Sequence, residues 1–202
     1  FEGRKRKSSA EEGIKTLSEC VDTMIVIPND KLLDIAEKKT TMLEAFATAD
    51  GVLSQGTQGI TDLITVPGII NLDFADVKTI MKQAGTAMMG IGTASGDTRA
   101  VDAAQQAISS RLLESSIDGA TRVLLSIAGS KDLGIQEIND AADLVANAVD
   151  PDANIIFGTV VDESLGDQVR ITVIATGFSD ANVNRQDQLF GQSQSSASKS
   201  AS

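Results

Sequence analysis

The sequence contains no histidine, tryptophan or tyrosine, and it has a single cysteine among 202 residues. The absence of histidine excludes His-based catalytic triads and His-ligated metal sites. One cysteine can form neither a cysteine-rich zinc site nor an internal disulfide. Any aromatic stacking on a ligand must use one of six phenylalanines. No apolar run approaches the roughly 20 residues that a membrane-spanning helix needs, so we expect no direct membrane insertion.

Positive charge is also scarce. The chain has 17 Lys and Arg against 28 Asp and Glu, which gives a net charge of −11. This balance argues against nucleic-acid binding, and the only basic cluster is Arg4–Lys7. The chain starts at Phe1 instead of methionine, and its basic first residues carry no apolar segment of the kind found in signal peptides. We therefore expect it to be a piece of a longer protein.

Apolar periodicity predicts alternating helices and strands, typical of an α/β fold. Helices are expected over residues 9–20, after Asn29, over 42–64, from the acidic loop to about 83, from 97 or 98 to 108, and over 135–149. Strands are expected over residues 23–27, 86–92, 121–128, 153–161 and 168–177. Residues 72–177 are interpreted as one α/β domain with a mixed, four-stranded sheet. The polar, low-complexity residues 179–202 are expected to be disordered because they offer little apolar surface to bury.

An acidic loop follows the long helix, in the order N-x-D-x-x-D: Asn71, Asp73 and Asp76. Asp73 and Asp76 are three residues apart and should share one face at the start of the next helix. One interpretation is helix capping, since Asn and Asp are favoured N-cap residues. The other is a pair of carboxylates that holds a water or a hydrated cation beside a phosphate, which suits phosphoryl transfer. Spacing alone does not separate the two.

A glycine-rich segment, Gly90–Gly96, follows a predicted strand and precedes a helix. That is the setting of a dinucleotide-binding turn, but the spacing is G-x-G-x-x-x-G rather than G-x-G-x-x-G. A tight turn with close backbone packing is the simpler interpretation. No phosphate-binding G-x-x-x-x-G-K-[ST] motif occurs.

Several stretches together resemble FtsZ, the bacterial tubulin-like family of cell-division GTPases. They are FEGRKR (1–6), IPNDKLL (27–33), NLDFAD (71–76), AMMG (87–90), AISS (107–110), NIIFGT (154–159) and VIATGF (173–178). The resemblance reaches to about residue 178, and the acidic loop in this setting is its most specific part. The family's glycine-rich phosphate loop, which lies in the N-terminal half, is missing.

The resemblance implies a site that is shared between subunits. The acidic loop would reach the nucleotide of the next subunit, where Asp73 and Asp76, supported by Asn71, would activate the hydrolytic water. The resemblance also implies a set of nucleotide contacts: Glu2 to the ribose, Arg6 to the phosphate and sugar side, Asn29 to the ribose or base edge, Phe46 by stacking on guanine, and Asp50 to guanine N–H groups.

Helix geometry gives an independent reason for sharing. Phe46 and Asp50 are one helical turn apart near one end of the long helix, and the acidic loop lies beyond its other end. If the helix is straight, roughly 30 Å separates the base contacts from the carboxylates. One subunit then cannot bring both onto one nucleotide, so the contact would be head to tail and would propagate into a filament.

The resemblance also implies a domain plan: the end of a Rossmann-like GTP-binding domain (1–40), a central helix (41–66), the catalytic loop with the C-terminal domain (67–178), and the tail (179–202). The expected ligand is GTP or GDP, with Mg2+ held through nucleotide or water. A homopolymer at the mid-cell division site in the cytoplasm is implied. Membrane tethers and division regulators would bind a C-terminal peptide beyond this chain. Without the phosphate loop, the chain alone is expected to be inactive.

A non-enzymatic module that caps the nucleotide face of an intact subunit is the alternative function, and a dinucleotide-binding enzyme is a third interpretation.

Overall fold

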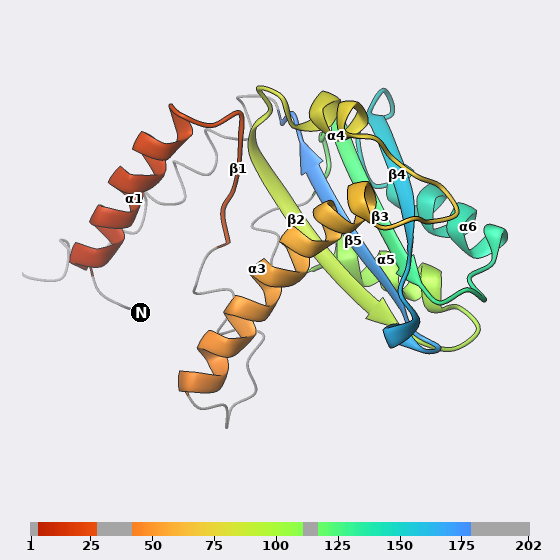
Figure 1. Cartoon of the computed structure of the whole chain (residues 1–202). Coiled ribbons are helices and arrows are strands. Elements are labelled where there is room, and N and C mark those ends of the chain that lie inside the picture. Colours follow the sequence, from red (N-terminus) through yellow and green to blue (C-terminus); the bar gives the residue numbers. More distant parts are fainter. Residues whose placement is uncertain (1–3, 28–41, 111–116, 179–202) are drawn as a thin grey trace, which may run out of the picture.

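The computed structural model describes residues 4–27, 42–110 and 117–178, except for the side chains of Arg4 and of several residues between 42 and 52. These residues form a mixed sheet of five strands in the order β1-β2-β5-β3-β4 (Figure 1). The strands are β1 (Thr23–Ile25), β2 (Gly85–Ala94), β3 (Arg122–Gly129), β4 (Asn154–Val161) and β5 (Val169–Thr176). β1 with β2 and β3 with β4 are parallel, whereas β5 runs antiparallel to both β2 and β3.

The α/β class and the mixed sheet are confirmed, but the predicted count of four strands is wrong. The extra strand is β1, which corresponds to the strand predicted over residues 23–27 and which the domain plan places in the preceding domain. Its three residues are only half-buried and pair with Gly85–Ala87 at the edge of the sheet. Local periodicity identifies a strand, but it carries no information about a partner some sixty residues away.

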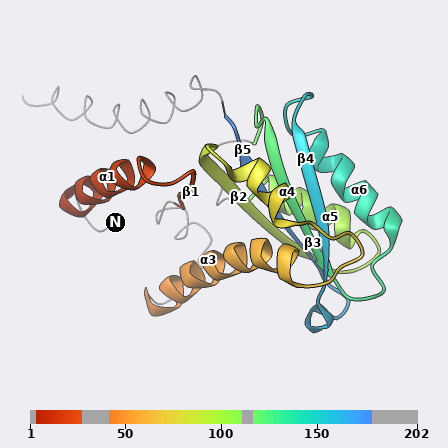
Figure 2. The same ribbon diagram turned by 45° about the horizontal axis from the view of Figure 1, so that its top comes forward.

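Helices cover both faces of the sheet. α5 (Arg99–Ile108) and α6 (Ile135–Ala146) pack on one face, and α3 (Met42–Thr65) and α4 (Phe74–Met81) lie on the other (Figures 1 and 2). β5 shows how the strands serve both layers. Val169, Ile171 and Val173 join the α5/α6 core, whereas Ile174 joins the α3/α4 core, as the alternation predicted. A short 3-10 helix, η1 (Glu163–Leu165), lies between β4 and β5.

The first helix, α1 (Arg4–Ser18), starts five residues before its predicted start. Ser9 is not its cap, because the Ser9 hydroxyl donates to the Lys5 carbonyl inside the helix. Every described residue of α1 is exposed, so no apolar stripe against the sheet marks where it begins. The predicted short helix after Asn29 and the tail over 179–202 lie outside the described residues.

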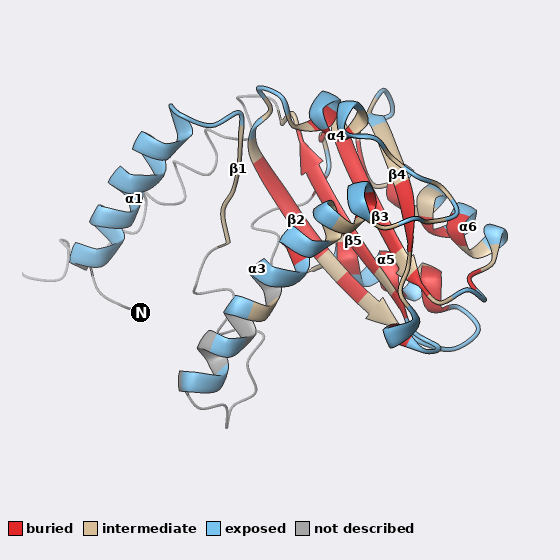
Figure 3. Ribbon diagram, in the orientation of Figure 1, coloured by how far each residue is buried: buried red, intermediate tan, exposed pale blue. Residues whose placement is uncertain are grey.

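The long helix α3 runs within a residue of its predicted bounds. Its 24 residues span about 36 Å at 1.5 Å per residue. Among its described side chains, burial increases toward the C-terminal end: Leu63 is 2% exposed, whereas Leu43 is 82% exposed. Figure 3 shows the N-terminal part of α3 extending away from the buried sheet. The two ends of α3 therefore lie in different surroundings.

Candidate functional site

The acidic residues form the start of α4. Asp73 is the N-cap, and its Oδ1 accepts the Asp76 backbone N–H at 2.9 Å. In return, Asp76 Oδ2 accepts the Asp73 backbone N–H at 3.2 Å. This reciprocal capping box satisfies two backbone donors that the first turn of a helix otherwise leaves unpaired. The structure therefore brings Asp73 and Asp76 together as predicted, and both perform the capping role.

Capping uses one oxygen of each carboxylate. Among the described residues, Asp73 Oδ2 and Asp76 Oδ1 have no hydrogen-bond partner. Asp73 is exposed and Asp76 is half-buried. The cap thus orients two carboxylates and leaves one acceptor oxygen on each for a ligand. A pair of carboxylates of this kind can bind a water molecule or a hydrated cation.

The loop before the acidic pair is attached to β4, an edge strand. The Ile70 N–H donates to the Thr159 hydroxyl at 2.8 Å, and the Thr159 N–H donates to the Ile70 carbonyl at 2.9 Å. Gly68 approaches the same strand so closely that an added Cβ would lie 1.7 Å from the Thr159 carbonyl oxygen. Gly68 and Thr159 thus set the path of the loop. The sequence analysis did not identify either, because no local signal links residues ninety positions apart.

Asn71 closes this loop. Its Oδ1 accepts the Gly68 N–H at 2.7 Å, and its Nδ2 donates to the Gly68 carbonyl at 3.3 Å. Both polar ends of the amide are therefore engaged within the loop. In this structure Asn71 supports the shape of the loop that leads to Asp73, which is an indirect way to assist the acidic pair.

Exposed apolar side chains lie near the acidic residues in the sequence. Phe74, directly after Asp73, is 67% exposed, and Ile69 is 54% exposed. Large apolar side chains that remain exposed beside a polar cluster are typical of contact surfaces. The surface that carries the carboxylates is thus suited to meet another protein surface.

The predicted nucleotide contacts are not assembled by the described residues. Glu2 and Asn29 lie outside them, and the Phe46 side chain is not described, although its backbone lies in α3. Asp50 is exposed on α3 and Arg6 is exposed on α1. From position 46 to the end of α3 is about 28 Å at 1.5 Å per residue, so α3 keeps the predicted base contacts away from the acidic pair (Figure 2).

Gly90 and Gly92 belong to a packing contact. Both lie inside β2, not in the turn that we had considered. A Cβ added at Gly90 or Gly92 would lie 2.0 Å from the carbonyl oxygen of Ala107 or Ala103 in α5. The close packing is confirmed, and it leaves no room for a phosphate against these two glycines. Only Gly96, at φ +94°, needs the backbone freedom of glycine for a turn.

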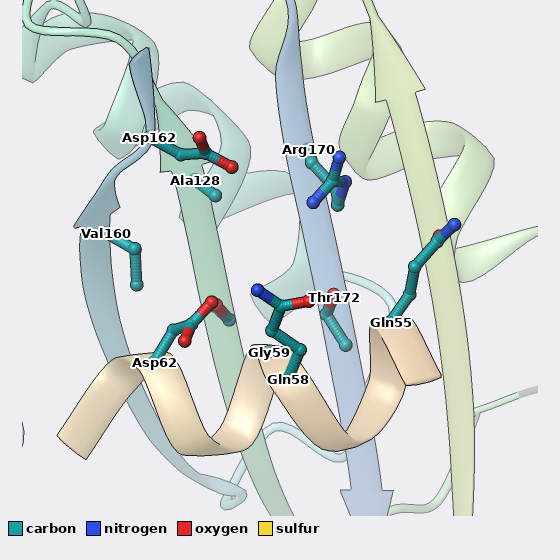
Figure 4. A pocket seen from close by; sticks show the side chains of 10 residues that line it. Gln55, Gln58, Gly59, Asp62, Ala128, Val160, Asp162, Arg170 and Thr172 are labelled. Atoms are coloured by element: carbon teal, nitrogen blue, oxygen red, sulfur yellow. The ribbon is translucent and has the colours of Figure 1, made fainter. Parts of the chain in front are cut away.

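A small cavity lies between α3 and the sheet. Figure 4 shows Gln58 and Asp62 of α3 on one side and Arg170 and Asp162 on the other. Its volume of about 20 Å³ is enough for roughly one water molecule. A nucleotide does not fit there.

A charged cluster on the opposite face was missed by the sequence analysis. Arg99, only 8% exposed, donates from Nε and Nη2 to the two carboxylate oxygens of Glu137, at 2.8 and 3.3 Å. Its Nη1 donates to Asp132 at 3.2 Å and to the Asp167 carbonyl at 3.0 Å. These bonds join α5 to the first turn of α6, to the loop that precedes α6 and to the turn between η1 and β5.

Charge pairing shifts the titration of this cluster. The Arg99 hydrogen bonds lower the pKa of Glu137 against the opposing effect of burial, and the pKa of Arg99 is raised mainly by Glu137. The pKa of Asp132 is lowered first by the Ser130 hydroxyl and then by Arg99. All three groups are therefore held in their charged forms, as expected for a structural ion cluster.

Two features are absent from the described part of the chain. No three or more carboxylate or cysteine side chains within it come close enough to hold a metal ion. None of its helices combines the length and the apolar character needed to cross a bilayer.

Residues 85–179 match the model of the FtsZ family, C-terminal domain. This chain carries the C-terminal domain of the FtsZ family. An empty FtsZ dimer from M. jannaschii is 42% identical, covers 82% of this chain and superposes with a TM-score of 0.78. The resemblance to FtsZ inferred from the motifs is thus confirmed.

The match is to part of FtsZ only, since the alignment covers 48% of the M. jannaschii chain. Two more distant structures share the fold. CetZ1 from Haloferax volcanii, a GDP-bound monomer, is 16% identical over 96% of this chain and 57% of its own, with a TM-score of 0.73. CetZ2 from the same organism, a GTPγS-bound protofilament, is 15% identical over 91% of this chain and 56% of its own, with a TM-score of 0.64.

Proposed function

We propose that this chain is part of a GTP-hydrolysing, self-assembling protein of the cell-division cytoskeleton, and that it supplies the acidic loop to GTP bound by a neighbouring subunit. Asp73 and Asp76 would orient the attacking water, and Asn71 would hold the loop. The observation that carries the proposal is the capping box. It fixes both carboxylates at an exposed helix start and leaves one oxygen of each available.

The position of the loop supports action on a neighbour. α3 separates the acidic pair from the predicted base contacts Phe46 and Asp50 by nearly its whole length. Exposed Ile69 and Phe74 beside the pair provide apolar contact area for another subunit. A head-to-tail arrangement would bring the acidic pair of one subunit to the nucleotide of the next, and repetition of that contact would produce a filament.

The remaining assignments are part of the same proposal. Glu2, Arg6, Asn29, Phe46 and Asp50 would contact GTP or GDP, with Mg2+ carried by the nucleotide or by water. Residues 1–40 would be the end of the GTP-binding domain, 41–66 the central helix, and 67–178 the catalytic loop with the C-terminal domain. The full-length protein would act in the cytoplasm at the division site, where tethers and regulators would bind a C-terminal peptide.

A second candidate is a non-enzymatic capping module. It is favoured by the same exposed Ile69 and Phe74, which could bind the nucleotide face of an intact subunit whatever the carboxylates do. Capping would shorten filaments without adding GTP turnover. Turnover and polymer mass, measured in the same mixture, separate the two candidates.

The test is GTP turnover by this chain mixed with an intact FtsZ subunit whose own acidic-loop aspartates are replaced by alanine. Alone, the chain should be inactive; the mixture should regain activity. The decisive variant is Asp73→Asn, because asparagine caps a helix as well as aspartate but carries no carboxylate. We expect it to lower the restored turnover by about 100-fold or more, the usual scale for loss of proton-transfer catalysis.

Asp162→Asn is the matched control, since Asp162 caps η1 far along the chain and accepts the Ser164 N–H. It should leave turnover unchanged. If Asp73→Asn is as active as the wild type, capping is the whole role of Asp73 and the catalytic proposal fails. If polymer disappears and turnover is never restored, the chain is a cap.

A further inference from the structure

The turn between α1 and β1 is hydrogen-bonded to the C-terminal end of α4, the helix that Asp73 caps. Asp22 Oδ1 accepts the Gln83 N–H at 3.1 Å, and the Asp22 carbonyl accepts the Gly85 N–H at 3.0 Å. The Thr23 hydroxyl donates to the Met81 carbonyl, the last residue of α4. Three hydrogen bonds from two adjacent residues therefore fix the exit of α4.

The turn that they hold has an unusual backbone. Gln83 has a φ of +50° and is the one non-glycine residue with positive φ in the described parts of the chain. Side chains make this conformation unfavourable, so it persists where surrounding contacts stabilise it. The Asp22 side chain accepts the N–H of Gln83 itself. The contact thus stabilises the bend through which the chain leaves α4 and enters β2.

The C-terminal domain holds the same end of α4 from the other side. The Thr176 hydroxyl donates to the Ile80 carbonyl at 3.3 Å, and Arg122 Nη1 donates to the Lys82 carbonyl at 3.1 Å. The end of α4 is therefore bound both by the sheet and by the α1–β1 turn. A shift of one relative to the other must be taken up by α4.

α4 is short, and its buried residues lie between the Asp73 end and the Gln83 end. Its eight residues span about 12 Å, and its buried residues are Val77 and Ile80. Rotation about these buried side chains would move the Asp73 end in the direction opposite to the Gln83 end. A displacement at the Asp22 contact therefore changes the direction in which the carboxylates of Asp73 and Asp76 point.

We propose that Asp22 is a positioning residue for the acidic pair: it couples the α1–β1 unit to α4 and so sets where Asp73 and Asp76 point. This inference rests on the proposed function, because it assigns Asp22 a role in GTP hydrolysis through α4. Asp22 itself is exposed and does not touch the substrate. The coupling links the α1 segment, which carries the predicted phosphate contact Arg6, to the catalytic loop.

The test compares Asp22→Ala, Asp22→Asn and Glu19→Ala in the mixture with the loop-deficient intact FtsZ subunit. Asp22→Ala removes the acceptor, Asp22→Asn keeps an oxygen that can accept the Gln83 N–H, and Glu19→Ala removes one negative charge from the same segment. Glu19 makes no hydrogen bond or ion pair within the described residues. Misalignment of catalytic groups by about 1 Å can cost up to 100-fold in rate.

We expect Asp22→Ala to lower kcat about tenfold. The KM for GTP and the concentration of chain that gives half-maximal stimulation should not change. Asp22→Asn should restore kcat, and Glu19→Ala should leave it at the wild-type value. Thr23→Val, which removes the hydroxyl that donates to Met81, should lower kcat in the same way as Asp22→Ala.

Amide hydrogen exchange of the chain alone gives a readout that does not need turnover. Asp22→Ala should speed exchange at Gln83 and also at Asp76, whose N–H is bonded to Asp73 at the opposite end of α4. Faster exchange at Gln83 alone, with unchanged kcat, overturns the inference. If the wild-type mixture shows no turnover, the proposed function fails, and exchange at Asp76 still decides whether Asp22 positions α4.

Discussion

The buried Arg99 cluster offers a stability prediction whose size follows from its geometry. The change is Arg99→Met, which keeps an unbranched apolar stem at the start of α5 and removes the guanidinium. It deletes a two-point hydrogen bond to Glu137, one bond to Asp132 and one to the Asp167 carbonyl. The bonds to Asp132 and Asp167 involve groups at the exposed rim, so the Glu137 pair dominates the cost.

Hydrogen bonds to charged groups contribute about 1.5–3 kcal/mol each. The Glu137 side chain is 27% exposed, so water partly replaces the lost guanidinium and the low end of this range applies. Two such bonds give an expected loss of about 3 kcal/mol in the free energy of unfolding. Urea unfolding followed by far-UV circular dichroism measures it, because a chain without tryptophan or tyrosine gives little useful fluorescence.

Arg170→Met is the matched control. Arg170 is half-buried on β5 and makes no ion pair with the described residues, so its loss should change stability by less than about 0.5 kcal/mol. The reasoning is refuted if Arg99→Met costs under about 1 kcal/mol, or if the two variants are equally destabilised. Such a result would mean that the desolvation of Arg99 cancels its hydrogen bonds.

The same cluster predicts a pH dependence. The folded-state pKa values of Glu137 and Asp132 lie below their ordinary values, so the stability that they contribute is present above pH ~4.3 and is lost as pH falls through the folded pKa. Wild-type stability should therefore decrease on acidification below about pH 4. Arg99→Met should lose less over that interval, since its carboxylates no longer pair with a guanidinium. Equal pH slopes would contradict the assignment.

Three glycine substitutions test close packing. Gly92→Ala should destabilise the chain by more than about 2 kcal/mol in urea unfolding, because its Cβ would lie 2.0 Å from the Ala103 carbonyl oxygen. Gly51→Ala, with nothing within 4 Å, should instead stabilise α3 by about 0.5–1 kcal/mol. Gly68→Ala should lower both GTP turnover in the mixture and the free energy of unfolding, because a Cβ 1.7 Å from the Thr159 carbonyl oxygen forces the acidic loop off β4. Unchanged turnover with an intact fold would show that the path of the loop is irrelevant.

Prediction from sequence succeeded where burial is periodic. The bounds of α3 and the two faces of β5 follow from spacings that the structure reproduces, because one face of each element packs into a core. The helix predicted over residues 9–20 is present as α1, but its start was placed five residues too late, and the described residues of α1 are all exposed. With no buried stripe, the polar first turn at Arg4–Lys7 gave no indication that a helix had begun.

Pairings over long distances in sequence were out of reach for the same analysis. β5 lies between β2 and β3, and β1 forms the edge of the sheet next to β2. Neither pairing can be inferred from the local periodicity of the sequence. The contacts that shape the candidate site have the same character: Ile70 with Thr159, and Asp22 with Gln83. The sequence identified the carboxylates, and the tertiary structure supplies what holds them.

The two interpretations of the acidic pair, capping and catalysis, are not alternatives in this structure. A flexible exposed carboxylate must lose rotamer freedom before it can orient a water, and that loss opposes catalysis. Here each carboxylate is already held by a backbone N–H of the other residue, so this cost falls on folding instead of on the reaction. A cap that leaves one oxygen of each pair member available is therefore a favourable starting point for a shared site. Because the cap survives Asp73→Asn while the charge does not, that single substitution separates the contribution of position from that of charge.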